Sequence, residues 1–540
     1  MNRWTLALVV FGVVPFAAAQ STGPLPPLTA QVEVHVVNVD VSVTDSNGPV
    51  GNLTKDDFEI LEDGKLQKIT NFAIINSTTE QKQPAAVAQN ATADNRRRML
   101  LIIDNNYLSI RDRNRALDTI EKYLDSSFNG EWAVATVGHA VDMLQPFTTD
   151  KALIHTALAK ARKMGSAEEQ SKIDRSVLSE RYTTSSDVNL PVDYQGKLDF
   201  SGQEQSFRNL LTVQNTARAV VDTARAYSAE SGKKFILLLT GGMEINTTFS
   251  AFNQVEESKE LQQIQLQTAE IVDAMVKEAN GANFTVHVVN ARNKEMVAPQ
   301  HDVTNRSSGI NSGNLLNDWN PSPIDTSDRD SIPLSIALGT GGMYLPSNDL
   351  AGSIQKIDSV TSNFYSLGYS PAHSGDRKYH TIRVKVHRRG VRVANRVGYY
   401  DQTPDDRLED MLRARMDFDP GYGTLPVRVQ LGNPSPAEKD LILPVTAEMP
   451  LARITVIPRD QNLVGRVHVY CSVFDVNGRN VGFSHQTQEV SMPQEVATSG
   501  GDFRYTVRVH LKKGEAFTVV ITLRDELSNE IGSKTQAVHL

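Results

Sequence analysis

The stretch from Arg98 to Ser109, RMLLIIDNNYLS, limits most strongly what this chain can fold into. A short apolar run, Met99 to Ile103, ends at Asp104, and a run of this length between polar residues is typical of a strand buried on both faces of a parallel sheet. A helical pattern follows over 112–124. Ligands of open α/β sheets bind beyond the carboxyl ends of the strands, so the sequence predicts a binding site at Asp104.

Strand and helix patterns alternate through the middle of the chain. Apolar runs at 235–239 and 284–289 are separated by helical periods, of which 207–231 is the clearest. Because this alternation indicates βαβ units, we expect a doubly wound, mostly parallel, Rossmann-like sheet covered by helices on both faces. Two polar stretches, about 166–205 and 291–329, interrupt the pattern and are interpreted as insertions.

The length and charge of the chain set its outer bounds. At 540 residues it is too long for one core and suggests about three domains. A net charge of −8 is mild for this length and argues against a dedicated nucleic-acid binder. The single cysteine, Cys471, excludes an internal disulfide framework and a cysteine-rich zinc site. It lies in the strand pattern VHVYCSVFDV, so we interpret it as a buried strand residue rather than a reactive thiol.

The N-terminus has the pattern of a secretory signal peptide. An apolar run from Leu6 to Phe16 ends on three alanines, Ala17 to Ala19, which is a small-residue cleavage pattern. The run is shorter than the roughly 20 residues that a spanning helix needs, which favours cleavage over an uncleaved membrane anchor. We therefore expect a signal peptide over 1–19, a mature chain starting at Gln20 with no transmembrane segment, and a secreted or periplasmic protein.

Both ends of the mature chain read as β-structure. Over 30–76, alternating valines and the turns 45–48 and 63–64 indicate a small β-module. Its acidic residues fit no EF-hand spacing, so solvated turn acids are favoured over a calcium site. A charged helix over 402–418 is interpreted as a linker, and the alternating strands of 422–540 suggest an immunoglobulin-like β-sandwich.

Several motifs in the chain occur in an order that is typical of one family. They are T-G-G-x-Y at 340–344, N-D-L at 348–350, Y-x-L-G-Y at 365–369, the hairpin pattern of 379–386 and 390–400, and the opening block of 39–72. Together they resemble the VWFA-related acidobacterial domain family, in which a β-module precedes a von Willebrand factor type A domain. The resemblance covers roughly 32–401 and implies a type A-like domain over 96–400.

The resemblance also implies a metal site at the end of the first strand, through an Asp-x-Ser-x-Ser motif. The equivalent positions here are Asp104, Asn106 and Leu108, of which Leu108 offers no ligand atom. A further family aspartate, after the fourth strand, would stand near Gly241. Ser109 could supply an oxygen if the loop were shifted.

Other residues near this motif could substitute for the missing ligands. Glu244 follows the Thr240-Gly241-Gly242 turn, and Thr183 and Thr184 lie in the insertion from which the family takes a threonine. Two interpretations stay open. Either Asp104 still binds Mg²⁺ or Ca²⁺ weakly, in the millimolar range, or the site is vestigial and Asp104 caps a helix or pairs with an arginine. We expect no tightly bound cofactor.

Enzymatic motifs are absent from the sequence. It contains no G-x-S-x-G elbow, H-E-x-x-H, P-loop or G-x-G-x-x-G pattern. None of the 12 histidines is paired at metal-ligand spacing, and His35, His139, His155 and His287 lie singly in or beside predicted strands and helices. These observations favour a non-enzymatic protein.

Two functions remain as hypotheses. The first is an exported protein-interaction or adhesion protein that binds a protein or cell-surface partner through the loops at the predicted sheet edge. The contact residues would be Asp104, Asn106, Tyr107, Ser109, Thr240 and Glu244. The second is an envelope hydrolase or carbohydrate-active protein whose site lies in the insertions at 166–205 or 291–329.

Overall fold

The chain folds into two compact units, Glu33–Met411 and a second unit that combines Met1–Val32 with Leu412–Leu540. The structure is a computed structural model. It describes residues 9–11, 36–46, 48–76, 97–127, 130–138, 140–167, 192–229, 232–243, 259–292, 329–346, 349–414, 425–437, 440–459, 462–476, 480–493, 501–528 and 530–539.

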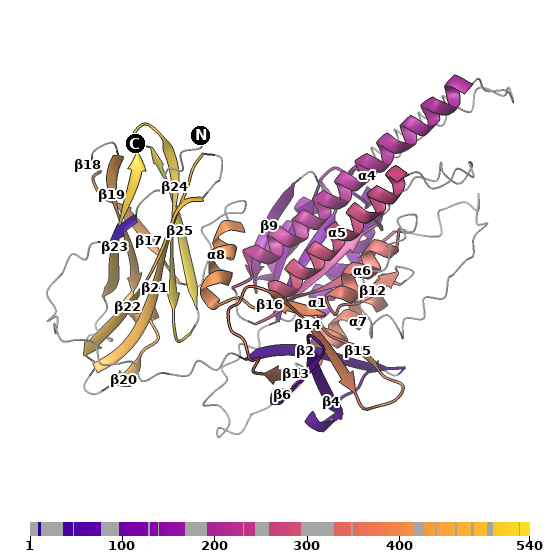
Figure 1. Ribbon diagram of the computed structural model, residues 1–540, viewed down its shortest axis with the longest axis horizontal. Helices are drawn as coiled ribbons and strands as arrows, with labels where there is room; N and C mark the ends of the chain where they lie inside the picture. The colour runs from indigo at the N-terminus through magenta and orange to yellow at the C-terminus, as the bar shows by residue number, and fades with distance from the viewer. Residues whose placement is uncertain are drawn as a thin grey trace. The chain divides into compact units, whose positions relative to one another are not determined.

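A six-stranded sheet lies at the centre of the larger unit, in the order β12-β11-β10-β7-β8-β9 (Figure 1). The strands are β7 Arg97–Asp104, β8 Glu131–Val137, β9 Val141–Thr148, β10 Lys233–Thr240, β11 Phe284–Asn290 and β12 Tyr344–Pro346. All neighbours run parallel except β8 and β9. Counted along the chain, the order is 3-2-1-4-5-6, and it reverses between β7 and β10.

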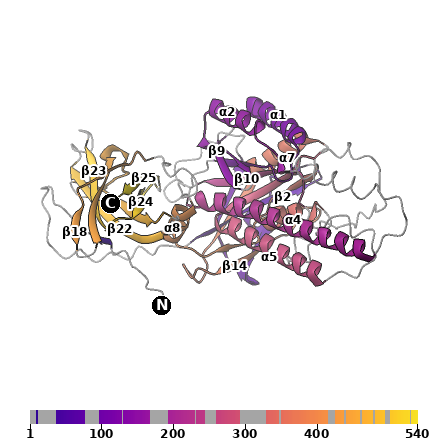
Figure 2. The same ribbon diagram turned by 90° about the horizontal axis from the view of Figure 1, so that it is seen from above.

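Helices cover both faces of this sheet (Figure 2). On one face lie α1 Ile110–Ser127, α2 Lys151–Arg162 and α7 Leu350–Ser362; on the other lie α4 Val192–Ala226 and α5 Lys259–Gly281, with α6 Ser331–Gly339 packed against α5 and β11. Every residue of β7 is buried. Met99, Leu101 and Ile103 point into the core formed with α1, α2 and α7, and the alternate residues face the other way. Burial on both sides explains why this strand is a continuous apolar run.

Strand β13, Asn363–Tyr369, joins the last helix of this layer to a second core. It lies between β2 Val37–Asp45 and β6 Ile69–Asn76 in a sheet of order β15-β2-β13-β6, where β15 is Arg392–Ala394 and β3 Gly48–Pro49 pairs with β2. A second sheet has the order β16-β14-β4-β5, with strands Gly398–Tyr400, Tyr379–Val386, Phe58–Glu62 and Lys65–Gln67. The two sheets share one hydrophobic core.

The expected boundary between a β-module at 30–76 and a separate domain at 96–400 is therefore corrected. Both neighbours of β13 come from the N-terminal segment, so that segment has no complete sheet of its own. The Tyr365 hydroxyl adds a buried link, since it donates to the Val50 carbonyl at 2.6 Å and accepts from the Leu53 amide at 3.1 Å. Sequence periodicity shows which residues are strands but not which strand each one pairs with.

The second unit consists of two antiparallel sheets around one core. One sheet contains β17 Arg428–Leu431, β18 Ser435–Ala437, β19 Asp440–Pro450 and β23 Asp502–Lys512; the other contains β20 Ile457–Arg459, β21 Asn462–Phe474, β22 Asn480–Pro493, β24 Ala516–Asp525 and β25 Ile531–His539. Cys471 lies fully buried on β21, as expected, and burial raises the pKa of its thiol to about 12.

Two short elements lie in the segments that the sequence predicts to be a signal peptide and a linker helix. Val9–Phe11, inside the expected signal peptide, form β1 and pair with β23, so cleavage after Ala19 would remove this strand. The charged helix expected over 402–418 is α8, Pro404–Ala414.

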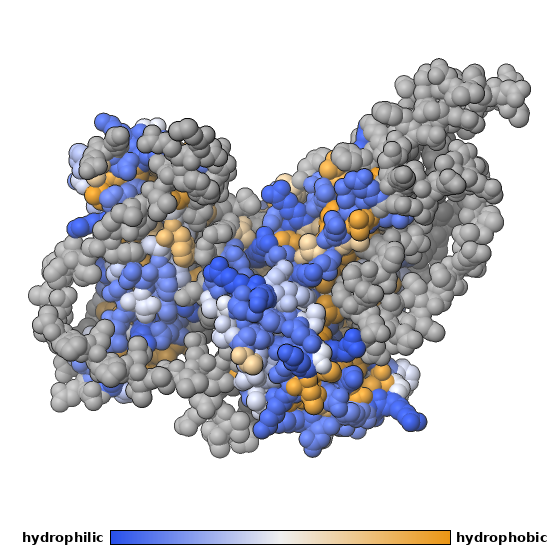
Figure 3. Space-filling view, viewed as in Figure 1, coloured by the Kyte–Doolittle hydropathy of each residue, from blue (hydrophilic) through white to orange (hydrophobic). Residues whose placement is uncertain are grey.

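None of the helices in the described part of the chain is both long and apolar enough to cross a lipid bilayer. On the face drawn in Figure 3, hydrophilic residues cover most of the described surface and hydrophobic ones form small groups between them.

Removing the N-terminal strands is predicted to unfold the larger unit. A fragment of residues 97–411 lacks β2, β4 and β6, so β13 loses both neighbours and the shared core is exposed. We expect residues 33–411 to unfold cooperatively in urea, and residues 97–411 to bind a hydrophobic dye and show no cooperative transition. Tyr365→Phe in 33–411 should lower the free energy of unfolding by about 1–3 kcal/mol, because it leaves two buried backbone groups unpaired. A cooperative 97–411 fragment would contradict the shared core.

Candidate functional site

Asp104 ends β7 at the point where the strand order reverses, next to the end of β10. Its side chain is completely buried. The Thr240 hydroxyl donates to Oδ2 at 3.0 Å, while the Asn106 amide and the Thr216 hydroxyl donate to Oδ1 at 3.1 and 3.4 Å. Both carboxylate oxygens are thus held by protein donors, and the residue neither caps a helix nor pairs with an arginine in these bonds.

Burial also changes the acidity of this carboxyl. Removal from water disfavours the charged form and raises the pKa of Asp104 to about 7, although its three hydrogen bonds act in the opposite direction. Desolvation therefore outweighs the polar contacts. Near neutral pH the group is divided between its acid and its anion.

The loop after Asp104 is packed inward rather than presented to solvent. Asn106, Tyr107 and Ser109 are all less than a tenth exposed, and Leu108 lies in the core beneath α1. The Asn106 side-chain amide donates to the Gly138 carbonyl at 3.1 Å and to the Thr216 hydroxyl at 3.3 Å, while its backbone amide is the donor to Asp104. These side chains hold the loop in place, so their expected use as exposed partner contacts is corrected.

Ser109 has a structural role at the start of α1. Its hydroxyl accepts from the Asp112 amide at 3.1 Å and donates to the Asp112 carboxylate at 2.9 Å, which is the arrangement of an N-terminal cap. The hydroxyl is therefore engaged by the helix and is not directed at Asp104. A shifted loop that would make Ser109 a metal ligand is not observed.

Gly241 stands near the position at which the resemblance implies a second aspartate. A Cβ atom at this position would lie 1.8 Å from the Tyr107 carbonyl oxygen, far inside van der Waals contact. The backbone of the loop after β7 thus occupies the space in which a side chain from β10 would stand. No residue larger than glycine fits here without a backbone shift.

The residues present do not fit the Mg²⁺ or Ca²⁺ ion that the resemblance implies. Such ions need several oxygen ligands, but both oxygens of Asp104 already accept hydrogen bonds from protein donors, Leu108 is in the core and Gly241 has no side chain. Glu244, Thr183 and Thr184 lie outside the described residues.

Segments that join the described elements at this edge include the predicted insertions. Ala167, just before 168–191, donates its amide to the Asn105 carbonyl at 3.0 Å. Met243, just before 244–258, donates to the carbonyl of Arg329, which follows 293–328, at 2.8 Å. Three long stretches of chain thus begin or end beside Asp104, at the carboxyl edge of the parallel sheet.

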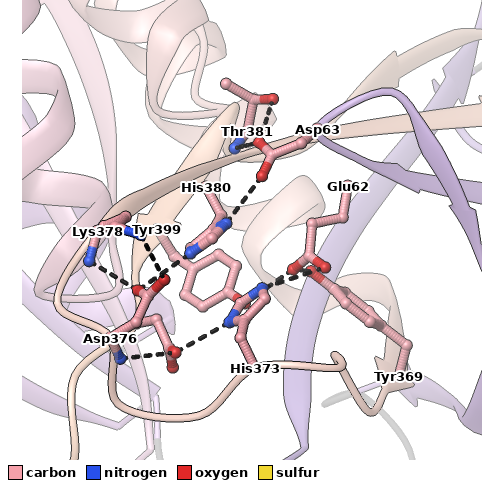
Figure 4. A network of polar contacts seen from close by, with 10 residues as sticks. Glu62, Asp63, Tyr369, His373, Asp376, Lys378, His380, Thr381 and Tyr399 are labelled. Carbon is pink, nitrogen blue, oxygen red and sulfur yellow. Dashed lines mark hydrogen bonds and ion pairs between the residues drawn. The ribbon is translucent and has the colours of Figure 1, made fainter.

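A second group of polar residues lies in the larger unit, in the β-sandwich formed by the sheets β15-β2-β13-β6 and β16-β14-β4-β5 (Figure 4). His373, Asp376, His380 and Asp401 each offer one ligand-type atom, and these four atoms lie within 4.8 Å of one another. The interpretation that no histidines are paired is wrong for His373 and His380. The spacing H-x-x-D-x-x-x-H in HSGDRKYH was the available signal, but Asp401 is brought in only by strand pairing.

Comparisons with known proteins leave the chain without an assigned family. No protein-family profile matches it, and no curated protein matches it significantly. An aerotolerance-related membrane protein of Bacteroides fragilis and the conserved hypothetical protein BatB of Bacteroides thetaiotaomicron are similar to 49% of this chain and 98% of their own, with 12% and 14% identity and TM-scores of 0.25 and 0.24. A β-glucuronidase of Bacteroides uniformis matches 33% of this chain and 19% of its own, with 11% identity and a TM-score of 0.15.

The raised pKa of Asp104 predicts a specific dependence of stability on pH. Between about pH 4 and pH 7 the folded state holds this proton and the unfolded state does not, so the free energy of unfolding falls as pH rises, by at most about 4 kcal/mol. Asp104→Asn removes this loss. The free energy of unfolding of the variant, relative to that of the wild type, should therefore rise between pH 4 and 7 and stay constant above pH 7. Urea unfolding of residues 20–540 in a Trp319→Phe background measures it through Trp132; a difference independent of pH would contradict the prediction.

The close approach at Gly241 predicts that a side chain there destabilises the fold. We expect Gly241→Ala to lower the free energy of unfolding by about 3 kcal/mol or more, because the new methyl group would collide with the backbone of Tyr107 and Leu108. Gly138→Ala is the matched control, since nothing lies within 4 Å of its Cβ position, and should change stability by less than about 1 kcal/mol. Equal stability of the two variants in urea unfolding would show that the loop is free to move.

Proposed function

We propose that this chain is an exported, non-enzymatic binding protein of the bacterial envelope. In this proposal a signal peptide over 1–19 is removed, and the central sheet is a doubly wound, type A-like sheet with a degenerate metal site. The partner is a protein or a cell-surface component. It binds at the carboxyl edge of the sheet without a bridging ion.

The position of the long segments supports this location. In open α/β sheets ligands bind where the strand order reverses, which here is between β7 and β10. Segments 168–191, 244–258 and 293–328 join the described structure beside this point. Long loops on a rigid sheet commonly carry recognition, so these segments are the proposed contact surface in place of the buried loop residues.

The single observation that carries the absence of a bridging ion is the state of Asp104. Its carboxylate is buried and accepts three hydrogen bonds, and the position of its missing family partner is filled by the Tyr107 carbonyl. An ion at this edge would have to displace these donors and take its remaining ligands from water or the partner. Recognition by polar and apolar contacts of the long segments needs neither change.

A packed histidine near the edge also favours binding over catalysis. His287 lies on β11, where burial lowers its pKa to about 3, and its Nδ1 accepts the Met343 amide at 3.2 Å. With Nδ1 occupied and a pKa far below neutrality, this ring is a weak proton acceptor and is poorly suited to act as a general base. A hydrolase with its site in the insertions remains the alternative outcome of the test below.

The proposal predicts partner capture that does not require Mg²⁺ or Ca²⁺. Residues 20–540 with a C-terminal tag are incubated with extract of the native envelope, with and without both ions. Capture should be equal in the two conditions and should persist in Asp104→Asn. Replacing 293–328 by a short Gly-Ser linker should abolish it, whereas replacing 494–500 in the second unit should not.

Two results would overturn this proposal. Capture that needs the ions and is lost in Asp104→Asn would restore a metal-dependent site. Turnover of an envelope polysaccharide or peptide that is lost with 293–328 would establish the hydrolase instead.

A further inference from the structure

The cluster of His373, Asp376, His380 and Asp401 is built by three parts of the β-sandwich. His373 and Asp376 lie in the loop between β13 and β14, His380 is the second residue of β14, and Asp401 directly follows β16. β14 and β16 pair with each other, with His380 opposite Tyr399. This pairing brings Asp401 back to the loop, where its Oδ2 accepts the Asp376 amide at 3.1 Å.

Inside the cluster, one nitrogen of each histidine lies close to one carboxylate of the cluster. His373 Nδ1 lies 2.9 Å from Asp401 Oδ2, and His380 Nε2 lies 3.2 Å from Asp376 Oδ1. The two rings are stacked with centroids 3.8 Å apart and planes within 12° of parallel. Two nitrogen and two oxygen atoms are thus gathered in one place, as Figure 4 shows for the labelled residues.

The opposite nitrogen of each ring lies close to a further carboxylate outside the cluster. His373 Nε2 lies 3.4 Å from Glu62 Oε2, and His380 Nδ1 lies 2.8 Å from Asp63 Oδ2. Metal-binding histidines commonly have this arrangement, in which the outer nitrogen donates to a carboxylate that orients the ring. Here the hydrogen bond is formed on His380 by Asp63, whereas Glu62 lies within ion-pair distance of His373 Nε2 without a hydrogen bond.

The two outer carboxylates are themselves fixed. Glu62 accepts the hydroxyls of Tyr369 and Tyr399 at 2.6 and 2.8 Å, and Asp63 accepts the amide of Thr381 at 2.8 Å. Asp63 stands in the turn between β4 and β5 with a φ of 47°, followed by Gly64 with a φ of 77°. Glu62 therefore lies at the end of a paired strand, and Asp63 lies in the tight turn that follows it.

The charge of the cluster also favours a cation. Four carboxylates, of Glu62, Asp63, Asp376 and Asp401, surround two imidazoles, and Asp401 is fully buried. The Arg407 guanidinium interacts electrostatically with Asp401 and offsets part of this charge. The Lys378 ammonium lies 3.7 Å from Asp376 but is 77% exposed, so water screens its contribution. A divalent ion among the four inner atoms would offset this negative charge where it is least hydrated.

We propose that His373, Asp376, His380 and Asp401 bind one divalent transition-metal ion of the zinc class. Two imidazole nitrogens and two carboxylate oxygens suit Zn²⁺ in four-coordination, whereas Mg²⁺ and Ca²⁺ prefer oxygen alone. With bonds of roughly 2.0–2.2 Å, ligand atoms of a tetrahedral ion lie about 3.3–3.6 Å apart. Binding therefore requires the pair now at 2.9 Å to open slightly and atoms up to 4.8 Å apart to approach by about 1 Å. His373 and Asp376 are about a quarter exposed, which leaves the ion a path from solvent.

The bound ion would tie the loop after β13 to β14 and to the end of β16. β13 is also the strand that joins the two cores of the larger unit. Fixing the loop that follows it should therefore stabilise the whole unit. This site is separate from the Asp104 edge and does not depend on the function proposed there.

The test is Zn²⁺ binding to metal-free protein of residues 20–540 from which any affinity tag has been cleaved. Calorimetry should show one equivalent bound, with a rise in the melting temperature, and Co²⁺ should give the visible absorption of a tetrahedral site. His373→Gln and Asp376→Asn, at partly exposed positions, should each lower Zn²⁺ affinity at least 100-fold, and Asp63→Asn by 10- to 100-fold.

The control variants separate this site from other sources of binding. His387→Gln removes a histidine that pairs with Glu59 at 3.2 Å in the same sandwich, and Asp104→Asn alters the other site; both should bind Zn²⁺ like the wild type. No stoichiometric Zn²⁺ binding would overturn the proposal. So would binding that persists in folded His373→Gln and Asp376→Asn proteins, because the cluster would then be an ionic network without a metal.

Discussion

The pairing of β13 with β2 on one side and β6 on the other is the contact on which the larger unit depends. β13 follows α7 directly, so one strand leaves the helix-covered sheet and becomes the middle of a different sheet. Its Tyr365 and Tyr369 then point into the sandwich core, where they reach residues about 300 positions earlier in the chain. The N-terminal segment therefore completes the fold rather than preceding it. The His373 cluster exists only because β13 ends there.

Two buried aspartates in this unit show how neighbours decide the chemistry of a carboxylate. Asp104 and Asp401 are both fully buried. The partners of Asp104 are hydroxyl and amide donors, which satisfy its oxygens, while burial raises its pKa and leaves the group partly neutral near pH 7. Asp401 contacts the His373 imidazole, whose other nitrogen lies 3.4 Å from Glu62. The first surroundings suit a structural hydrogen-bond acceptor, whereas the second combine the nitrogen and oxygen donors that a transition metal requires.

The sequence was informative wherever a physical signal was local. The runs at 99–103, 235–239 and 284–289 are strands because burial on both faces demands uninterrupted apolar residues, and Asp63-Gly64 forms a turn because both positions adopt positive φ. It did not show that the N-terminal strands pair with β13, nor that loop residues such as Tyr107 and Leu108 are buried. Those are consequences of register between segments far apart in the chain, which periodicity does not encode.

Gly241 shows the limit of comparing residue types position by position. The resemblance implies an aspartate near this position, and the glycine found there suggests, from the sequence alone, a site that lacks one ligand but keeps its shape. In the structure the Tyr107 carbonyl stands where that side chain would begin, so the loop has closed onto the glycine. The loss is then one of space as well as of an oxygen atom, and restoring a carboxylate alone would not rebuild the site.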